Sequence, residues 1–586
     1  MTDPVGALTG STAVALAVFA GVTLLSLVAV TSVSRRNRTA EAFYTGGGGF
    51  DGRVNGIALT GDYLSAAAVL GVIGTVAGFG YDGIMVAIGS LTGWVLTLLF
   101  VGEPMRNVGR FTLGDVLSYR LRARPVRAAA AAATLLVSLL YLVANIAGAG
   151  ELVALLADIP DSDRATQSLI ITGVGVLMTV YVLVGGMTGT TLVQIIKATL
   201  LLTVAAGLAV WVLGYYFFDV SRLLGATTIT NPGQGQQLLA PGLYSGTTPL
   251  ETMDFLSLGV AGMLGPASLP HLLTRLFTVP DGRQARRSVA WAIGAVGGFF
   301  LCAIVIGLGA SALLGGDAIS SAPGGVNAAS GLLAYRVGGA ILLGLFAAVA
   351  FATVLAVVAG LTITAAASFA HDIYANLLRR GRVGSRSEVR VARLTALVVG
   401  ILATAGGIAA NGQNIAALVG VLFAVAASTV LPALLYGLYW RRFTTAGALA
   451  CVYGGAAVTL TLIAFSPLVS GRPDAFFPGL DFAWFPMVNP GAISVPAAFV
   501  LGAVATLLSR REPDAEHRYA EMQVRALTGA ATSGGSGPSP TTEPIPHVGP
   551  RHPRAGAPGS RGPARPDGTP MSPAEHRRPE WTVPRR

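Results

Sequence analysis

The sequence predicts an all-α integral membrane protein, and its hydropathy, its low charge density and its long apolar runs are the observations that predict it. The chain has 586 residues, of which 53% are hydrophobic and only 11% are charged, and its mean hydropathy is +0.66. A soluble protein carries about 25% charged residues. The apolar runs are long and uninterrupted, whereas a membrane β-barrel shows short segments of alternating polarity. The expected fold is therefore a bundle of transmembrane helices.

Thirteen apolar runs are long enough to cross a bilayer, whose hydrocarbon core of about 30 Å requires about 20 helical residues. The first run has no basic residue before it and is too long for the core of a signal peptide, so it counts as a span. The ninth is too long to cross straight and is expected to tilt, bend or project. The predicted spans are residues 8–33, 54–79, 84–104, 128–156, 168–185, 190–214, 254–278, 288–313, 337–368, 393–410, 414–439, 445–466 and 491–509.

Arginine residues mark every second loop of this arrangement. The loops after the first, third, seventh, ninth and eleventh spans are rich in arginine, whereas the alternate loops contain only single arginines. Basic residues concentrate on the cytoplasmic side of a membrane. The pattern predicts about 13 helices with the N-terminus outside and the C-terminus in the cytoplasm. The uncharged turn at 185–189 is placed by this counting alone. The net charge of +11 then reflects topology and not a nucleic-acid-binding face.

The second predicted span, NGIALTGDYLSAAAVLGVIGTVAGFG at 55–80, differs from an ordinary lipid-facing helix. It contains six glycines, and Asp62 lies well inside it. An ionisable side chain at this depth is costly in lipid and faces a cavity or a partner. Gly61 and Asp62 mark the point where the helix is expected to open and expose backbone groups. The segment forms either half of a binding site or a glycine-rich packing helix with a structural Asp62.

The seventh predicted span is interrupted as well, at Gly265, Pro266 and Pro270, because proline lacks a backbone N–H and breaks the helical hydrogen bonding. The two interrupted spans lie five spans apart and enter the membrane from opposite sides. Spans 2–6 and 7–11 therefore fit an inverted repeat. Interrupted helices at matching places of two such halves indicate the binding site of a transporter.

This repeat sets the expected domain organisation. An N-terminal helix with its cytoplasmic loop precedes the first repeat, and an extracellular loop separates it from the second. Two further spans and a cytoplasmic tail follow. The tail is rich in Pro, Gly, Ser and Arg and is expected to be largely disordered, apart from a short helix near 514–527. The boundaries are 1–53, 54–214, 215–253, 254–439, 440–510 and 511–586.

The segment 106–127 precedes the fourth span on the predicted cytoplasmic side. It forms either an amphipathic helix on the inner membrane surface, with Asp115 paired to an arginine, or a plain loop.

Four stretches resemble the sodium:solute symporter family and, within it, the cation/acetate (monocarboxylate) symporter branch. They are FYTGGGGFDGRVNGIALTGDYLSAA at 43–67, GGMTGTTLVQIIKATLL at 185–201, GPASLPHLLTRLFTV at 265–279 and FATVLAVVAGLTITAAASFAHDIYANL at 351–377. The resemblance extends over about residues 5–525. It implies a LeuT-like core of two inverted five-helix repeats. It also implies a secondary active symporter that imports acetate or a similar short-chain monocarboxylate, such as propionate or pyruvate, coupled to Na⁺ or H⁺ by alternating access.

The resemblance also implies a cation site between the second and ninth spans. Many family members carry hydroxyl groups at two of its positions where this chain has Ala356 and Val357, which weakens a direct transfer of a sodium site. Asp62 then provides either an anionic ligand or the carrier of a proton. The cation-binding residues carried over by motif are Gly61, Asp62, Leu64, Thr353, Ala356 and Val357.

The substrate is expected between the middle of the second span and the break in the seventh. Three adjacent alanines at 66–68 are small and apolar, whereas a sugar site needs several hydrogen-bonding side chains. This lining suits a small substrate whose carboxylate binds backbone N–H groups at a half-helix N-terminus. Alternatively, the alanines only allow close helix packing. The predicted substrate-binding residues are Asp62, Tyr63, Ala66, Ala67, Gly265, Pro266 and Ser268.

Lys197 and Arg275 are the candidates for coupling or gating. Lys197 is the only lysine of the chain and lies about two turns into the sixth span. It either extends to the inner surface, pairs with Asp62, or stands near the cation or substrate route. Arg275 lies near the inner end of the seventh span, where it either locks an inner gate against a carboxylate or marks the membrane boundary.

The chain shows no nucleotide-binding P-loop, no metal-ligand cluster and no nucleophile constellation, and its two cysteines predict no disulfide framework. We therefore expect no enzyme, no catalytic residues and no ATP-driven transport. The expected partners are the monocarboxylate, the cation and the lipid bilayer of the cell membrane, with no nucleic acid and no cofactor or metal beyond transported Na⁺ or H⁺. The alternatives are a membrane sensor on the same fold or a symporter of another small organic solute.

Overall fold

The structure is a computed structural model of the chain, and it describes residues 12–33, 49–157, 159–160, 163–231, 233–380, 382–413, 415–473 and 475–529. The loop after the first predicted span lies outside these residues, as does the part of the tail from residue 530 that is predicted to be disordered. The described residues all belong to one compact unit, Met1–Gly535.

The described residues are helical, apart from loops and one isolated bridge between Ser470 and Phe477. Within the described residues, four short π-helical and four short 3₁₀ segments accompany the α-helices. The α-helices are α1 (Thr12–Val33), α3 (Gly52–Tyr63), α4 (Ile73–Phe79), α5 (Tyr81–Leu96), α6 (Gly102–Val108), α7 (Leu113–Ser118), α8 (Ala123–Leu156), α9 (Arg164–Tyr215), α10 (Val220–Thr230), α11 (Pro249–Leu264), α12 (Pro270–Arg275), α13 (Gly282–Leu314), α14 (Gly316–Ser320), α15 (Ala329–Ala367), α16 (Ser385–Ala409), α17 (Ile415–Thr429), α18 (Leu431–Tyr439), α19 (Thr445–Leu449), α20 (Gly455–Ala464), α21 (Gly491–Leu508) and α22 (Pro513–Thr528).

Among the described residues, ten helical stretches are long and apolar enough to cross a membrane, or eleven when the broken pair α3 and α4 counts as one span. Two of the thirteen predicted spans are missing from this count. The first corresponds to α1, of which a shorter apolar stretch, Ala13–Leu25, is recognised. The seventh is divided into the short helices α11 and α12. The number thirteen and the orientation of the termini stay predictions.

The second predicted span is a broken helix, as the sequence predicts. Helix α3 ends at Tyr63, and the chain continues into the π-helical segment Ala67–Val72 and α4 at an angle of 69°. The break falls at Leu64, whose backbone is extended, and not at Gly61 and Asp62, which remain in the last turn of α3. A glycine inside a helix costs only about 1 kcal/mol and does not by itself end it.

The seventh predicted span is broken where the prolines predict it. Helix α11 ends at Leu264, a single 3₁₀ turn spans Pro266–Ser268, and α12 begins at Pro270 after the extended residue Leu269. Proline is well suited to the first helical position, because the missing N–H has no partner there in any helix. Pro266 therefore follows the end of α11, and Pro270 starts α12.

Helix α9 differs from the prediction. A charge-free turn was expected at 185–189 between the fifth and sixth spans, but the backbone is helical throughout Arg164–Tyr215. The prediction of this turn rested on span counting alone. The stretch contains no proline that would interrupt the helix.

Helix α15 occupies the centre of the bundle and packs against α9, α1, α8, α16 and α13. Every residue from Phe346 to Ala367 is buried, as expected for a helix that is apolar on all sides. Gly338 and Gly339 have non-helical backbone angles, so the predicted ninth span bends near its start. This bend is one of the ways in which an over-long span was expected to fit the membrane.

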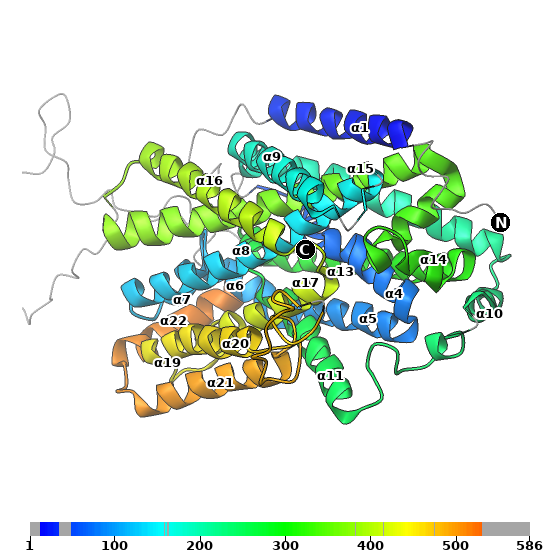
Figure 1. Cartoon of the computed structure of the whole chain (residues 1–586). Coiled ribbons are helices and arrows are strands. Elements are labelled where there is room, and N and C mark those ends of the chain that lie inside the picture. Colours follow the sequence, from blue (N-terminus) through cyan, green and yellow to red (C-terminus); the bar gives the residue numbers. More distant parts are fainter. Residues whose placement is uncertain are drawn as a thin grey trace, which may run out of the picture. The chain divides into compact units, whose positions relative to one another are not determined.

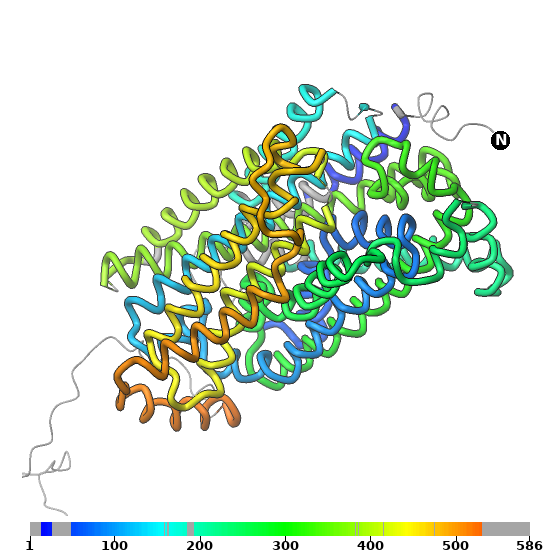
Figure 2. Tube along the Cα trace, turned by 60° about the horizontal axis from the view of Figure 1, so that its bottom comes forward, coloured from blue at the N-terminus to red at the C-terminus, as the bar shows by residue number. Residues whose placement is uncertain are grey.

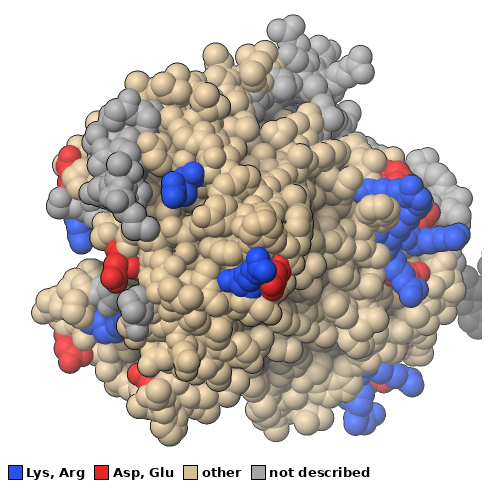
Figure 3. All heavy atoms as spheres, turned by 90° about the vertical axis from the view of Figure 1, so that its right-hand side faces the viewer, with Lys and Arg blue, Asp and Glu red and all other residues tan. Residues whose placement is uncertain are grey.

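The two ends of the bundle differ (Figures 1 and 2). One end carries α6, α7, α19 and α22, and the other carries α10 and α14. Helix α22 confirms the predicted helix at 514–527 and packs against α6, and the Tyr119 hydroxyl donates to Glu521 at 2.7 Å. Figure 3 shows the end with α10 and α14 as mostly neutral surface with scattered charged side chains.

Candidate functional site

Asp62 and Arg275 form a buried ion pair between the two broken spans. Asp62 lies in the last turn of α3, and Arg275 is the last residue of α12. Arg275 Nε donates to Asp62 Oδ2, and the two side chains are 0% and 1% exposed. Removal of either partner leaves an uncompensated charge in a buried position. The pair joins the interrupted helix of the first half to that of the second.

Helix α9 brings polar side chains to this pair. Gln194 Nε2 donates to Asp62 Oδ1. Thr191 Oγ1 accepts a hydrogen bond of 2.6 Å from Arg275 Nη1. Residues three apart lie on one face of a helix, so Thr191 and Gln194 reach the pair together.

Lys197 extends the same face of α9 by one more turn. Its Nζ atom donates to the backbone carbonyl oxygen of Thr353 in α15 at 3.0 Å, and the residue is 4% exposed. Gln194 Nε2 lies 3.4 Å from the carbonyl oxygen of Ala356, one turn along α15. Lys197 therefore points into the bundle, and its side chain does not extend to the inner surface.

Two glycines make room for this group. A Cβ atom at Gly61 would lie 2.7 Å from the backbone oxygen of Gln194, so glycine lets α3 approach α9 closely. A Cβ atom at Gly360 of α15 would lie 2.8 Å from Asp62 Oδ1. Such distances are shorter than a van der Waals contact, so the charged group fills the space between α3, α9 and α15.

Several buried polar atoms near the pair lack a hydrogen-bond partner among the described residues. They are Arg275 Nη2, Gln194 Oε1 and both ring nitrogens of His271. The His271 ring packs against the Tyr141 ring at 5.5 Å, and the backbone of Asp62 is nearby without an aligned hydrogen bond. A buried polar atom without a partner is costly, and such atoms mark places where water or a polar solute binds.

The predicted substrate residues of the first break are packed among other helices. Tyr63 lies edge-on to Trp94 of α5 at 5.2 Å. Ala66 faces Gly148 of α8, where a Cβ atom would lie 3.0 Å from the Ala66 Cβ. Ala67 is buried and opens the π-helical segment after the break.

The predicted substrate residues of the second break lie against α17 and α5. A Cβ atom at Gly265 would lie 2.5 Å from Phe423 Cβ, and one at Gly93 of α5 would lie 2.9 Å from Pro266. The Ser268 hydroxyl donates to the Leu264 carbonyl at 2.7 Å.

Tyr141 and Phe423 lie between the two breaks. The Tyr141 hydroxyl donates to Ser65 Oγ at 3.1 Å at the first break, and its ring lies 6.5 Å from that of Phe423, which abuts Gly265 at the second. The structure thus brings the two predicted halves of the substrate site to opposite sides of this aromatic pair. The substrate role of the predicted residues stays a prediction.

The predicted cation residues are also brought near one another, but protein donors engage three of them. The Asp62 carboxylate accepts from Arg275 and Gln194, the Thr353 carbonyl accepts from Lys197, and the Ala356 carbonyl accepts from Gln194. The Thr353 hydroxyl donates to the Val349 carbonyl at 2.8 Å. Gly61, Leu64, Ala356 and Val357 are buried and offer only backbone oxygens.

Sequence reasoning missed Gln194 and Thr191. Both precede Lys197 at intervals of three in an apolar span, and this spacing of polar residues on one helix face was the available signal. Sequence reasoning also left open which residue pairs with Arg275. Which helix faces α12 at this depth depends on tertiary packing.

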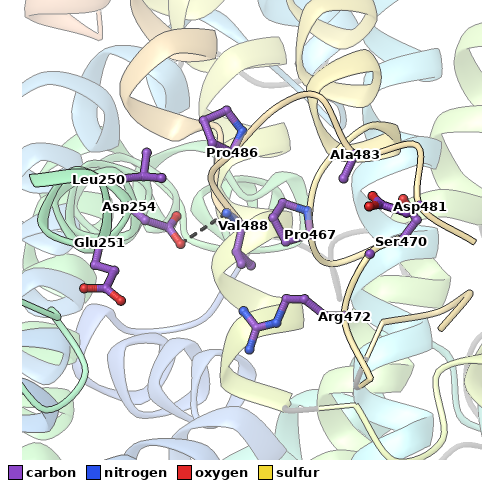
Figure 4. Close-up of a pocket in the computed structure, with 11 residues that line it drawn as sticks. Leu250, Glu251, Asp254, Pro467, Ser470, Arg472, Asp481, Ala483, Pro486 and Val488 are labelled. Atoms are coloured by element: carbon purple, nitrogen blue, oxygen red, sulfur yellow. Dashed lines mark hydrogen bonds between the residues drawn. The ribbon is translucent and has the colours of Figure 1, made fainter. Parts of the chain in front are cut away.

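A cavity of about 330 Å³ lies away from this group, between the first turns of α11 and the segment 467–488 (Figure 4). Two carboxylates that line it, those of Asp254 and Glu251, bind backbone N–H groups of the protein. Asp254 accepts hydrogen bonds from the backbone N–H groups of Val488 and Asn489, at 3.1 and 2.8 Å. Glu251 caps the start of α11 through Thr248.

A second charged cluster lies where α7, α8, the π-helical segment Ser368–Leu378 and α16 meet. Arg127 Nη1 is 2.8 Å from carboxylate oxygens of both Asp115 and Asp372, which confirms the predicted pairing of Asp115 with an arginine. His371 bridges Asp115 at 3.4 Å and Glu388 at 3.1 Å. Asp115, His371 and Asp372 lie close enough to share a metal ion, but Arg127 already neutralises the two aspartates.

The comparisons with known proteins agree with this architecture. The model of the sodium:solute symporter family matches residues 43–455. The chain is 46% identical to a protein named monocarboxylic acid transporter from Corynebacterium glutamicum, over 90% of this chain and 97% of that protein. It is 39% identical to the uncharacterized symporter YwcA of Bacillus subtilis, over 88% and 98% of the two chains.

Among solved structures, the chain is similar to a Na⁺-coupled sialic acid symporter in a substrate-bound outward-open state. The TM-score is 0.64 at 17% identity, with 85% of this chain and 98% of that chain covered. This similarity establishes the common fold, the LeuT-like arrangement that the family resemblance implies.

These findings define a multi-pass transporter of the plasma membrane and not an enzyme. The chain belongs to the sodium:solute symporter family.

Proposed function

We propose that the chain is a secondary active symporter that imports acetate or a similar short-chain monocarboxylate, such as propionate or pyruvate. Transport is coupled to Na⁺ or H⁺ and proceeds by alternating access. The substrate lies between the two helix breaks, near the buried pair of Asp62 and Arg275.

The observation that carries this proposal is the unpaired N–H group of the buried Arg275. Arg275 pairs with Asp62, and its Nη2 atom has no partner among the described residues. A buried guanidinium with a free N–H group is suited to a carboxylate, which accepts charge-assisted hydrogen bonds. A monocarboxylate can supply the partner that this group lacks.

The size of the surroundings supports a small substrate. Ala66, Ala67 and Gly265 contribute no bulk, and the space between the breaks is shared with Tyr141 and Phe423. These neighbours offer few hydrogen-bonding side chains, so a polyhydroxylated solute would lose hydrogen bonds to water without replacement. The name of the relative from Corynebacterium glutamicum supports the same substrate class.

Alternating access requires this buried group to open to each side in turn. The breaks at Leu64 and Leu269 leave α4 and α12 connected to α3 and α11 by short extended segments. Such segments absorb changes of backbone angle, so the half-helices can pivot while the rest of the bundle stays packed.

The test is uptake of labelled pyruvate and acetate into proteoliposomes that contain the full chain, with a Na⁺ gradient and a H⁺ gradient imposed separately. Acetic acid crosses bilayers passively, so pyruvate carries the conclusion, and protein-free liposomes set the background. We expect gradient-driven uptake that Asp62→Asn abolishes. Uptake of neither compound under either gradient would refute the substrate class and leave a symporter of another small solute.

A further inference from the structure

We infer that the ammonium group of Lys197 takes the place of a transported sodium ion, and that the chain imports its substrate without sodium. The transport experiment that tests this inference depends on the proposed function. It assigns to Lys197 the position that the family resemblance gives to a cation.

The first support is the position of Lys197 Nζ. It donates at 3.0 Å to the backbone carbonyl of Thr353, one of the residues predicted to bind a cation. Gln194 Nε2, one turn earlier on α9, lies 3.4 Å from the backbone carbonyl of Ala356, another of these residues. Both oxygens thus face N–H donors that belong to the protein.

The second support is the shortage of remaining oxygen ligands. Hard cations are bound by several oxygen atoms at short distances. Ala356 and Val357 have no side-chain oxygen, and the Asp62 carboxylate is engaged by Arg275 and Gln194. A sodium ion at this place would compete with Arg275 and Gln194 for the carboxylate. It would also compete with Lys197 for the Thr353 carbonyl.

The third support is the balance of charge. Asp62 and Arg275 already balance each other within the buried group, and Lys197 is a further buried basic side chain. A sodium ion would add a positive charge to this buried position. A co-bound cation is therefore not required to neutralise the site.

The fourth support is the close packing of the group. Gly61 and Gly360 bring α3 and α15 against Gln194 and Asp62, so closely that a single Cβ atom at either glycine would collide. The position between α3, α9 and α15 is filled by side chains.

The test compares uptake by the full chain in proteoliposomes with sodium present on both sides and with N-methylglucamine in its place. We expect a H⁺ gradient to drive pyruvate uptake in both media, with less than about twofold difference between them. Lys197→Met should lower uptake by about tenfold or more, because it removes the basic group that occupies the predicted cation position and its hydrogen bond to the Thr353 carbonyl. Lys197→Arg keeps a cation and should retain more activity than Lys197→Met.

Ile196→Met is the matched control, because Ile196 is the neighbouring residue on α9 and is 50% exposed. It should transport like the wild-type protein. Uptake that requires sodium, or a Lys197→Met variant as active as the wild type, would overturn the inference.

Direct binding of radioactive sodium to the purified protein separates this inference from the proposed function. The wild-type protein should show no saturable sodium binding. Sodium binding by the wild type that Lys197→Met leaves unchanged would overturn the inference even if no substrate is transported. Failure of uptake alone, under every gradient, would refute only the substrate class.

Discussion

The two charged groups of this protein differ in how completely their members are paired. In the cluster beside α7, Arg127 and His371 bridge three carboxylates, and Asp372 also accepts hydrogen bonds from Thr112 and Ser368 at 3.1 and 3.2 Å. In the group between α3, α9, α12 and α15, two basic side chains share Asp62. Arg275 Nη2 and Gln194 Oε1 have no partner within the described residues.

This difference separates a structural cluster from a binding site. A fully paired network rigidifies the elements that it joins, and it has no capacity left for a ligand. A group with unpaired polar atoms can still bind a ligand that supplies the missing partner. The comparison assigns ligand binding to the central group and helix positioning to the cluster beside α7.

The largest expected effect is that of Asp62→Asn in the central group. It leaves the Arg275 guanidinium buried without a carboxylate, which costs about 3–5 kcal/mol. We expect a marked fall in the thermal unfolding temperature of the detergent-purified protein, together with loss of pyruvate uptake.

The double variant Asp62→Asn/Arg275→Gln is the control, because it removes both charges. It should recover much of the lost stability without recovering uptake. A double variant that transports would show that the pair only stabilises the fold.

Asp372→Asn in the cluster beside α7 should have a smaller effect. The amide still accepts one hydrogen bond, and Arg127 keeps its contact with Asp115 at 2.8 Å. We expect a loss of about 1–3 kcal/mol, measured by thermal unfolding, with uptake per folded molecule largely retained. Loss of uptake at unchanged stability would instead place this cluster in the transport cycle.

The pH dependence of stability sharpens the comparison at Asp115, which lies in α7 outside the spans. Burial by itself raises the pKa of Asp115, but His371 and Arg127 outweigh it and hold that pKa below its ordinary value. The ionised carboxylate therefore stabilises the fold above its unfolded pKa of about 4, and this contribution is lost as the pH falls through the lower folded value.

The measurement is the difference in unfolding temperature between the wild type and Asp115→Asn. It should shrink as the pH falls below about 4. A difference that grows as the pH falls below about 4 would contradict the assigned direction.

The smallest effect is expected for an exposed pair. Arg286 Nη1 lies 3.9 Å from Glu103 Oε2, and the Arg286 side chain is 67% exposed. Arg286→Ala should change stability by less than about 1 kcal/mol and leave pyruvate uptake unchanged. A loss of stability as large as that of Asp372→Asn would mean that the exposure of an ion pair does not predict its contribution to stability.

The elements that the sequence predicts well are those set by local chemistry. The break between α11 and α12 follows from Pro266 and Pro270, which cannot continue a helix, and the buried run of α15 follows from its apolar composition. The turn expected at 185–189 was placed by counting spans alone, and the backbone there is helical. The break after α3 was expected at Gly61 and Asp62 but falls at Leu64, because glycine permits a break without imposing one.

The sequence by itself determined the fold class, the two interrupted helices and the importance of Asp62, because hydropathy, proline and a buried charge act through local free energies. Only the tertiary structure decided that Asp62 pairs with Arg275 and that Lys197 turns inward to the Thr353 carbonyl. The partners of the first contact are 213 positions apart in the sequence, and those of the second are 156 positions apart. Such pairs depend on which helix faces meet, and that is decided by the packing of the whole bundle.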